Sequence, residues 1–244
     1  MILKIDINCD MGESIKDLEN GNDEALMPFI SSVNIACGFH AGNEHIMANT
    51  IKNAQKYGLY IGAHPGFNDK KNFGRVNMNL SKEELTECLF YQINLLKVMV
   101  EENGGKLNHV KPHGALYNMS AANQEIAFTI AEAIYSIDKN LILFGLSESF
   151  SISEAKAVGL KTKSEVFADR AYLSDGSLCP RNRDGAVFSN IENVKSQVKG
   201  IINNGKIETI NQEIIQIIAE TICVHSDTPN ALEYAKTIFE LVKI

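Results

Sequence analysis

Short apolar runs alternate along this chain with longer segments in which apolar residues recur at helical spacing. The short runs are typical of strands buried in a parallel sheet, and the longer segments are typical of helices that cover such a sheet. Seven runs are predicted to be strands: 2–9, 32–37, 59–63, 107–112, 141–146, 164–168 and 221–225. Six segments are predicted to be helices: 43–57, 81–103, 120–138, 147–158, 190–203 and 229–243.

Local signals mark the ends of some helices. The letters SKEE at 81–84 form a capping box, and the Gly-Gly pair at 104–105 ends the same helix. Thr-Pro at 228–229 opens the last helix. The segment 206–218 breaks the pattern because its residues alternate like two short strands, and it is predicted to be a hairpin or an extra strand.

Repeated strand–helix units predict an α/β fold with a parallel sheet. The length of 244 residues is near the roughly 250 that are typical of a (β/α) barrel, and a doubly wound open sheet is the alternative. Because linker-like stretches, repeats and low-complexity segments are lacking, we expect residues 1–244 to form a single domain.

Composition and charge limit the classes of binding partner and the cellular location that we expect for this protein. A net charge of −7 argues against nucleic acid or an anionic membrane as the main partner. No signal peptide and no apolar run of membrane-spanning length is present, so a cytoplasmic protein is expected. The cysteines are odd in number and form no C-x-x-C pair, which predicts free thiols: Cys9, Cys37, Cys88, Cys179 and Cys223.

Polar residues follow the first strand, at the end where parallel α/β folds bind ligands. Asp6, Asn8 and Asp10 alternate and therefore share one face. An alternating strand is often simply half solvated. In a sheet that is buried on both faces, however, a row of carboxylates is costly without partners, so a functional role is favoured.

Histidines stand at the ends of the next three strands. His40 lies in a loop between two glycines, and His64 precedes the forced turn Pro-Gly. The fourth strand ends in HVKPHGALYN, where His109, Lys111 and His113 share a face. A lone histidine such as His109 is more often a core or surface residue, but a lysine and a histidine on either side of a proline indicate a site.

The remaining strand ends add charge. Glu165 and Asp169 share a face of the sixth strand, and the Asp169–Arg170 neighbours are either a structural ion pair or an arginine held to bind an anion. His225 ends the seventh strand, and Arg75 either clamps an anion or lies at the surface. Because these strand ends meet on one side of a parallel sheet, the sequence predicts one active site there.

Six sequence blocks, in order from residue 6 to 229, resemble the LamB/YcsF family, the A subunits of bacterial 5-oxoprolinase. The blocks are NCDMGES, NIACGFHAG, IGAHPGF followed by FGR, HVKPHGALYN, EVFADRAY, and TICVH followed by DTP. Two positions depart from the family pattern. Asn43 stands where the family usually has Asp, and an amide cannot act as a base; Ser226 stands where the family often has Gly.

The resemblance implies an irregular seven-stranded (β/α) barrel related to the glycoside hydrolase/deacetylase group. It also implies a protein that works with B and C subunits to cleave 5-oxo-L-proline (pyroglutamate) to L-glutamate with consumption of ATP. A hydrolase of this kind would activate the lactam oxygen by phosphorylation and then admit water, which requires anion-binding groups, a base and an acid.

Roles for individual residues are hypotheses on this basis. The expected catalytic residues are Asp10, Glu13, His64, Lys111, His113 and Asp169. Lys111 and Arg170 would neutralise a phosphate or the substrate carboxylate, one of the acids would serve as base or hold a metal ion, and the histidines would move protons. The expected substrate-binding residues are Asn8, His40, Arg75, Tyr117, Glu165, Arg170 and His225.

The cofactors implied are ATP and a divalent cation such as Mg²⁺, with the protein's metal ligands left open. Deacetylase-like relatives use an aspartate and two histidines, a set that Asp10, His40 and His64 could match. The sequence has no P-loop, so ATP would bind by another arrangement or on a partner subunit. The alternatives are a stand-alone metal-dependent amidase or deacetylase and a non-catalytic oxoproline-binding subunit.

Overall fold

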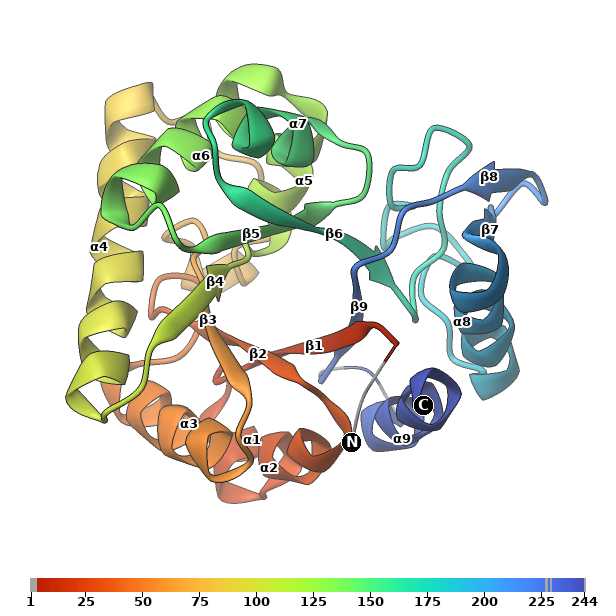
Figure 1. The fold of residues 1–244 in the computed structure, drawn as a ribbon, viewed down its shortest axis with the longest axis horizontal. Coiled ribbons are helices and arrows are strands. Elements are labelled where there is room, and N and C mark those ends of the chain that lie inside the picture. The colour runs from red at the N-terminus through yellow and green to blue at the C-terminus, as the bar shows by residue number, and fades with distance from the viewer. Residues whose placement is uncertain (1–3, 227, 229, 244) are drawn as a thin grey trace.

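Seven parallel strands close into a barrel at the centre of the molecule (Figure 1). The computed structural model describes residues 4–226, 228 and 230–243. The strands follow the order β1-β2-β3-β4-β5-β6-β9, and β9 pairs with β1 to close the ring. Their bounds are β1 (Asp6–Met11), β2 (Ser32–Ala36), β3 (Tyr60–His64), β4 (Leu107–Val110), β5 (Ile142–Leu146), β6 (Lys161–Phe167) and β9 (Thr221–His225). The predicted barrel is confirmed, and the doubly wound sheet was the wrong alternative.

Helices surround this barrel on the outside (Figure 1). The α-helices are α1 (Ile15–Glu19), α2 (Asn22–Leu26), α3 (Glu44–Lys56), α4 (Lys82–Glu102), α5 (Gly114–Ala122), α6 (Gln124–Ile137), α7 (Phe150–Ala157), α8 (Ile191–Asn204) and α9 (Ala231–Val242). Two 3₁₀ turns, η1 (Met27–Phe29) and η2 (Lys70–Asn72), complete them. The capping box before α4 is confirmed: Ser81 Oγ accepts from Glu84 N, and Glu84 Oε2 accepts from Ser81 N. Within the described parts of the chain, none of the helices has the length and apolarity to cross a bilayer.

The prediction of one helix over 120–138 was wrong. The segment contains two helices, because the chain leaves helical geometry at Asn123, where φ is −130° and ψ is 117°. Asn123 ends α5 and caps α6, its side chain accepting a hydrogen bond from Ile126 N. The short helices α1 and α2 were missed, and Asp227 and Pro229, expected near the start of the last helix, lie outside the described residues.

The alternating segment 206–218 forms a hairpin, as predicted. Strands β7 (Lys206–Glu208) and β8 (Ile214–Gln216) pair antiparallel and are not part of the barrel. They lie beyond α8 at the edge of the molecule (Figure 1).

The two faces of the barrel strands differ in polarity. On β1, Ile7, Cys9 and Met11 are buried in the apolar core, whereas Asn8 and Asp10 join a polar hydrogen-bond network. Asn8 Nδ2 donates to Glu165 Oε1 (2.8 Å), an interaction that spans the barrel from β1 to β6. The sequence analysis noted that buried polar groups on β1 would be costly without partners. Hydrogen bonds of this kind offset that cost. All five cysteines are free thiols.

His109 is a core histidine, one of the two interpretations that the sequence left open. It is fully buried, its ring stacks on Phe144 with centroids 4.0 Å apart, and its Nε2 lies 2.7 Å from Asn34 Oδ1. Burial lowers the pKa of His109 to about 3. The ring occupies the space beside Gly62, where any Cβ would overlap His109 Nε2, so the neighbouring strand must carry glycine at this point.

Candidate active site

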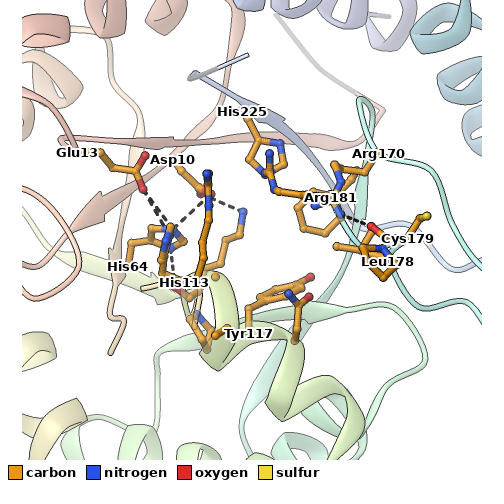
Figure 2. Close-up of a pocket in the computed structure, with 18 of the residues that line it drawn as sticks. Asp10, Glu13, His64, His113, Tyr117, Arg170, Leu178, Cys179, Arg181 and His225 are labelled. Atoms are coloured by element: carbon orange, nitrogen blue, oxygen red, sulfur yellow. Dashed lines mark hydrogen bonds and ion pairs between the residues drawn. The ribbon is translucent and has the colours of Figure 1, made fainter. Parts of the chain in front are cut away.

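A cavity of about 530 Å³ opens at the carboxyl ends of the strands (Figure 2). Asp10, His64, Phe167 and His225 reach it from the ends of β1, β3, β6 and β9. The residues from the sequence prediction that line it are Asp10, Glu13, His64, Arg75, Lys111, His113, Tyr117, Arg170 and His225. The predicted side chains thus converge on one mouth of the barrel, as the strand-end argument required.

The other predicted residues lie behind this lining. Asn8, Glu165 and Asp169 are fully buried and His40 is 1% exposed, so they touch the lining residues and not the open cavity. These four residues were expected to take part directly in substrate binding or catalysis. In the structure they contact the side chains that line the cavity and fix the positions of those side chains.

Lys111 sits at the floor of the cavity between two carboxylates. Its Nζ lies 3.0 Å from Asp10 Oδ1, 2.9 Å from Glu165 Oε1 and 3.1 Å from Cys223 Sγ. Burial lowers the pKa of Lys111, but Asp10 and the other acidic neighbours outweigh it and raise the pKa well above its usual value. The ammonium is thus already neutralised by the protein, which makes it a weaker anchor for an external anion than the sequence suggested.

Asp10 is the acid that links this floor to the histidines. Its Oδ2 lies 3.3 Å from His64 Nε2, and its Oδ1 accepts from Asn34 Nδ2 (2.7 Å). Burial raises the pKa of Asp10, but His64 and Lys111 more than compensate and hold it well below its usual range. Asp10 is therefore an ionised carboxylate at neutral pH.

Three histidines and Glu13 gather at one end of the cavity, where Figure 2 shows Glu13, His64 and His113 pointing toward one another. His113 Nδ1 lies 2.9 Å from His64 Nε2, and Glu13 Oε1 lies 3.4 Å both from His113 Nδ1 and from His40 Nε2. The His40 and His113 rings stack with centroids 3.8 Å apart. Burial, followed by the neighbouring histidines, lowers the pKa of His40 and of His113 well below the usual value. These four residues are one of two groups that could hold a metal ion among the residues that the structure describes; the other is Asp10, Cys223 and His225.

His225 and Asp169 form a pair on the opposite side. Both carboxylate oxygens of Asp169 lie 3.0 Å from His225 Nδ1, and Thr228 Oγ1 donates to Asp169 Oδ2 (3.0 Å). Burial raises the pKa of Asp169, but His225 outweighs it and lowers the pKa. Asp169 was one of three acids, with Asp10 and Glu13, of which one was expected to act as base or to hold a metal ion. In the structure its carboxylate contacts Nδ1 of His225 and so fixes the orientation of that ring, while Nε2 of His225 makes no contact with Asp169.

Arg170 anchors the irregular segment that follows β6. Its Nη2 donates to the carbonyl of Cys179 (2.6 Å) and its Nε donates to the carbonyl of Ala186 (3.3 Å). Burial, followed by the nearby Arg181, lowers the pKa of Arg170 to about 10. The adjacent Asp169 contacts His225 and Thr228, so the structural ion pair, one of the two alternatives that the sequence left open, does not describe this residue. The other alternative, an arginine held to bind an anion, stays a prediction, and Arg170 also fixes a loop at the cavity wall.

Sequence reasoning missed several lining residues, notably Asn118, Arg181 and Ser226. Arg181 lies in an irregular segment without periodicity, so no pattern pointed to it. Cys223 was interpreted only as a buried thiol, although its position two residues before His225 on a strand places both on one face. Its contact with Lys111 is tertiary, and no local pattern indicated it.

Asn43 caps a helix and lies outside the cavity lining. It precedes α3, and its side chain accepts a hydrogen bond from Ile46 N (3.0 Å). Aspartate and asparagine are equally good N-caps, so Asn43 can cap α3 as well as the aspartate that the family usually has at this position.

Comparison with known proteins supports one family. The LamB/YcsF family profile matches residues 5–243. The 5-oxoprolinase A subunit of Staphylococcus carnosus is 47% identical, over 98% of this chain and 94% of the relative, and that of Shouchella clausii is 47% identical, over 96% and 92%. The crystal structure of a lactam utilization protein from Thermus thermophilus superimposes with a TM-score of 0.90 at 37% identity, over 98% of this chain and 95% of that one. A putative cellobiose-phosphate cleavage protein from Enterococcus faecalis, at 10% identity and a TM-score of 0.52 over 99% and 91%, shares the fold alone.

Proposed function

Because the chain belongs to the LamB/YcsF family, we propose that it is the A subunit of an ATP-dependent 5-oxoprolinase that opens 5-oxo-L-proline to L-glutamate with B and C subunits. The observation that carries this proposal is the 47% identity to 5-oxoprolinase A subunits over nearly the full length of both chains. Because these relatives are named as subunits, an assembly of several chains is implied.

The chemistry of a lactam explains why ATP is needed. An amide carbonyl is a poor electrophile, and ring opening near neutral pH is close to thermodynamic balance, so phosphorylation of the lactam oxygen both activates the carbon and drives the reaction. The cavity of about 530 Å³ has room for a small acid together with a phosphoryl group. Because the sequence has no P-loop, ATP binds by another arrangement or on a partner subunit.

The two sides of the cavity suggest a division of labour. Arg75, Arg170 and Arg181 bring positive charge to the lining, and they are the groups to receive the substrate carboxylate or a phosphate. His225, oriented by Asp169, is the general base for water. Asp10 is an ionised carboxylate beside His64 on the other side of the cavity, where His64 and His113 lie 2.9 Å apart.

The test is reconstitution. The chain is mixed with candidate B and C subunits, and glutamate formed from pyroglutamate is measured with and without ATP. We expect glutamate only when all three chains and ATP are present. Absence of glutamate in every combination would refute the proposal, and turnover by this chain alone without ATP would replace it by the second candidate.

That second candidate is a stand-alone metal-dependent amidase or deacetylase. The observation in its favour is the convergence of a glutamate and three histidines beside the cavity. The third possibility, a non-catalytic oxoproline-binding subunit, predicts a different outcome: Asp10→Asn or His113→Gln would weaken binding of oxoproline without selectively slowing the chemical step in the assembled complex.

A further inference from the structure

We propose that the four side chains at this end of the cavity form a binding site for a zinc-class divalent ion: Glu13, His40, His64 and His113. They come from the ends of four consecutive barrel strands, and one donor atom from each lies within 4.8 Å of the others. The inference concerns metal binding by this chain and does not depend on the identity of the substrate.

The spacing of the donor atoms matches tetrahedral coordination. With Zn–N and Zn–O bonds of about 2.0–2.1 Å, two ligands of a tetrahedral ion are about 3.3 Å apart. Glu13 Oε1 lies 3.4 Å from His113 Nδ1 and 3.4 Å from His40 Nε2, and His64 Nε2 lies 2.9 Å from His113 Nδ1 and 4.0 Å from Glu13 Oε1. These four separations lie within about 0.7 Å of the coordination value. Because the His40 and His113 rings are parallel, one of them must also tilt so that both nitrogens point at the ion.

His64 and His113 each have one ring nitrogen, here called the outer nitrogen, that points away from the other ring and contacts a backbone carbonyl. These contacts determine whether the two nitrogens that face each other carry a proton. His64 Nδ1 lies 2.7 Å from the carbonyl of Lys111, and His113 Nε2 lies 2.9 Å from the carbonyl of Phe73. A carbonyl only accepts, so both outer nitrogens must carry the proton. In the neutral rings, His64 Nε2 and His113 Nδ1 then present lone pairs to each other at 2.9 Å, and Asp10 Oδ2 lies 3.3 Å from the same His64 nitrogen. This arrangement is repulsive unless a cation, either a proton or a metal ion, lies between these atoms. Backbone carbonyls that hold the second nitrogen of a histidine are also the usual outer partners of metal ligands.

His40 is the second, independent indication. It is 1% exposed, and among the residues that the structure describes neither of its ring nitrogens has a hydrogen-bond partner. The ring cannot swing away easily, since it stacks on His113 and its Cβ approaches Gly74 so closely that a Cβ there would lie 2.8 Å from it. Its Nε2 lies 3.4 Å from Glu13 Oε1 without forming a hydrogen bond. A buried imidazole without hydrogen bonds is costly, and an ion at this point would supply the missing interaction.

A neighbouring group of potential ligands does not need a metal. Asp10, Cys223 and His225 also lie close together, but the ammonium of Lys111 already occupies that position, 3.0 Å from Asp10 Oδ1 and 3.1 Å from Cys223 Sγ. The positive charge there is supplied by the chain itself.

The donor set selects the kind of ion. Three imidazoles and one carboxylate suit zinc, whereas Mg²⁺ prefers oxygen ligands and keeps several waters. The ion is thus distinct from any Mg²⁺ that accompanies ATP. Because Glu13, His64 and His113 line the cavity, the ion would lie at its wall and add positive charge where an anionic ligand enters.

The test uses the tag-free, full-length chain, stripped with a chelator and titrated with zinc by calorimetry. Cobalt is then substituted, and its visible absorption reports the coordination geometry. We expect one equivalent of zinc per chain and the intense bands of tetrahedral cobalt. His40→Gln and Glu13→Gln should each lower zinc affinity by about 100-fold or more, since loss of mere outer-sphere partners already costs 10–100-fold.

Two control variants distinguish zinc binding at these four side chains from zinc binding elsewhere on the protein. His45→Gln removes an exposed histidine and should leave zinc affinity unchanged, and so should Cys223→Ser in the neighbouring group. Circular dichroism and thermal unfolding of each stripped variant show whether it folds. Failure of the parent chain to bind stoichiometric zinc, equal affinity in His40→Gln, or loss of binding in Cys223→Ser would overturn the proposal. Since no substrate is present, these outcomes are independent of the reconstitution assay.

Discussion

Lys111 provides the most direct test of how the barrel tolerates buried carboxylates. Replacing it by methionine keeps most of the side-chain volume but removes the ammonium that lies 3.0 Å from Asp10 Oδ1 and 2.9 Å from Glu165 Oε1. Glu165 is fully buried and Lys111 is 2% exposed, so solvent cannot replace the lost charge.

The expected loss is large because a buried acid is left unpaired. At an effective dielectric constant of about 20, each contact contributes roughly 5–6 kcal/mol of attraction, and desolvation of the ammonium offsets several kcal/mol of it. Breaking buried pairs of this kind typically costs about 3–5 kcal/mol, and we expect Lys111→Met to lower the free energy of unfolding by that amount. The exposed pair Lys82–Glu132 is shorter, at 2.7 Å, yet Lys82→Met should cost far less than Lys111→Met because water screens the exposed charges.

The assay is urea unfolding followed by far-UV circular dichroism, since the chain has no tryptophan. Glu165→Gln supplies the decisive comparison. In the parent chain it should destabilise, whereas in the Lys111→Met background it should stabilise, because it removes a buried charge that has lost its partner. A loss from Lys111→Met no greater than that from Lys82→Met, or a Glu165→Gln effect of the same sign and size in both backgrounds, would refute the reasoning.

Three further predictions concern other parts of the chain. Burial raises the pKa of Asp23 to about 6. The folded protein therefore holds this proton more tightly than the unfolded chain does, and stability is lost as the pH rises from about 4 to about 6. Relative to Asp23→Asn, the parent should lose about 3 kcal/mol of unfolding free energy over this range. Urea titrations of both proteins at several pH values measure this difference. Asp169→Asn should lower kcat of the reconstituted enzyme by about 10²–10⁴-fold and shift its pH–rate profile, with little change in KM, because His225 loses its fixed orientation; an unshifted profile would contradict this role. Gly62→Ala should destabilise by about 1–3 kcal/mol or more, because the new Cβ meets the ring of His109, and a thermal midpoint equal to the parent's would contradict that packing.

The order of elements and the polarity of each strand were readable from the sequence. Period-two alternation on β1 separated Ile7 and Cys9 from Asn8 and Asp10, and strand–helix repetition predicted a barrel whose strand ends would carry the chemistry. These features are local, since they depend on residues within a few positions of one another. The six sequence blocks also indicated the family, because their residue types and their order along the chain match those of LamB/YcsF proteins.

Tertiary structure alone decided which side chains meet. Lys111 turned out to be neutralised by acids 101 and 54 positions away, and Asp169 to hold His225 from behind the cavity instead of facing it. His64 and His113 came to face each other across a 2.9 Å gap because two backbone carbonyls take their outer nitrogens. Strand periodicity determines the face on which a residue lies, but the closure of the barrel sets the distances between faces. Only those distances determine whether two ionisable groups pair, repel or share an ion.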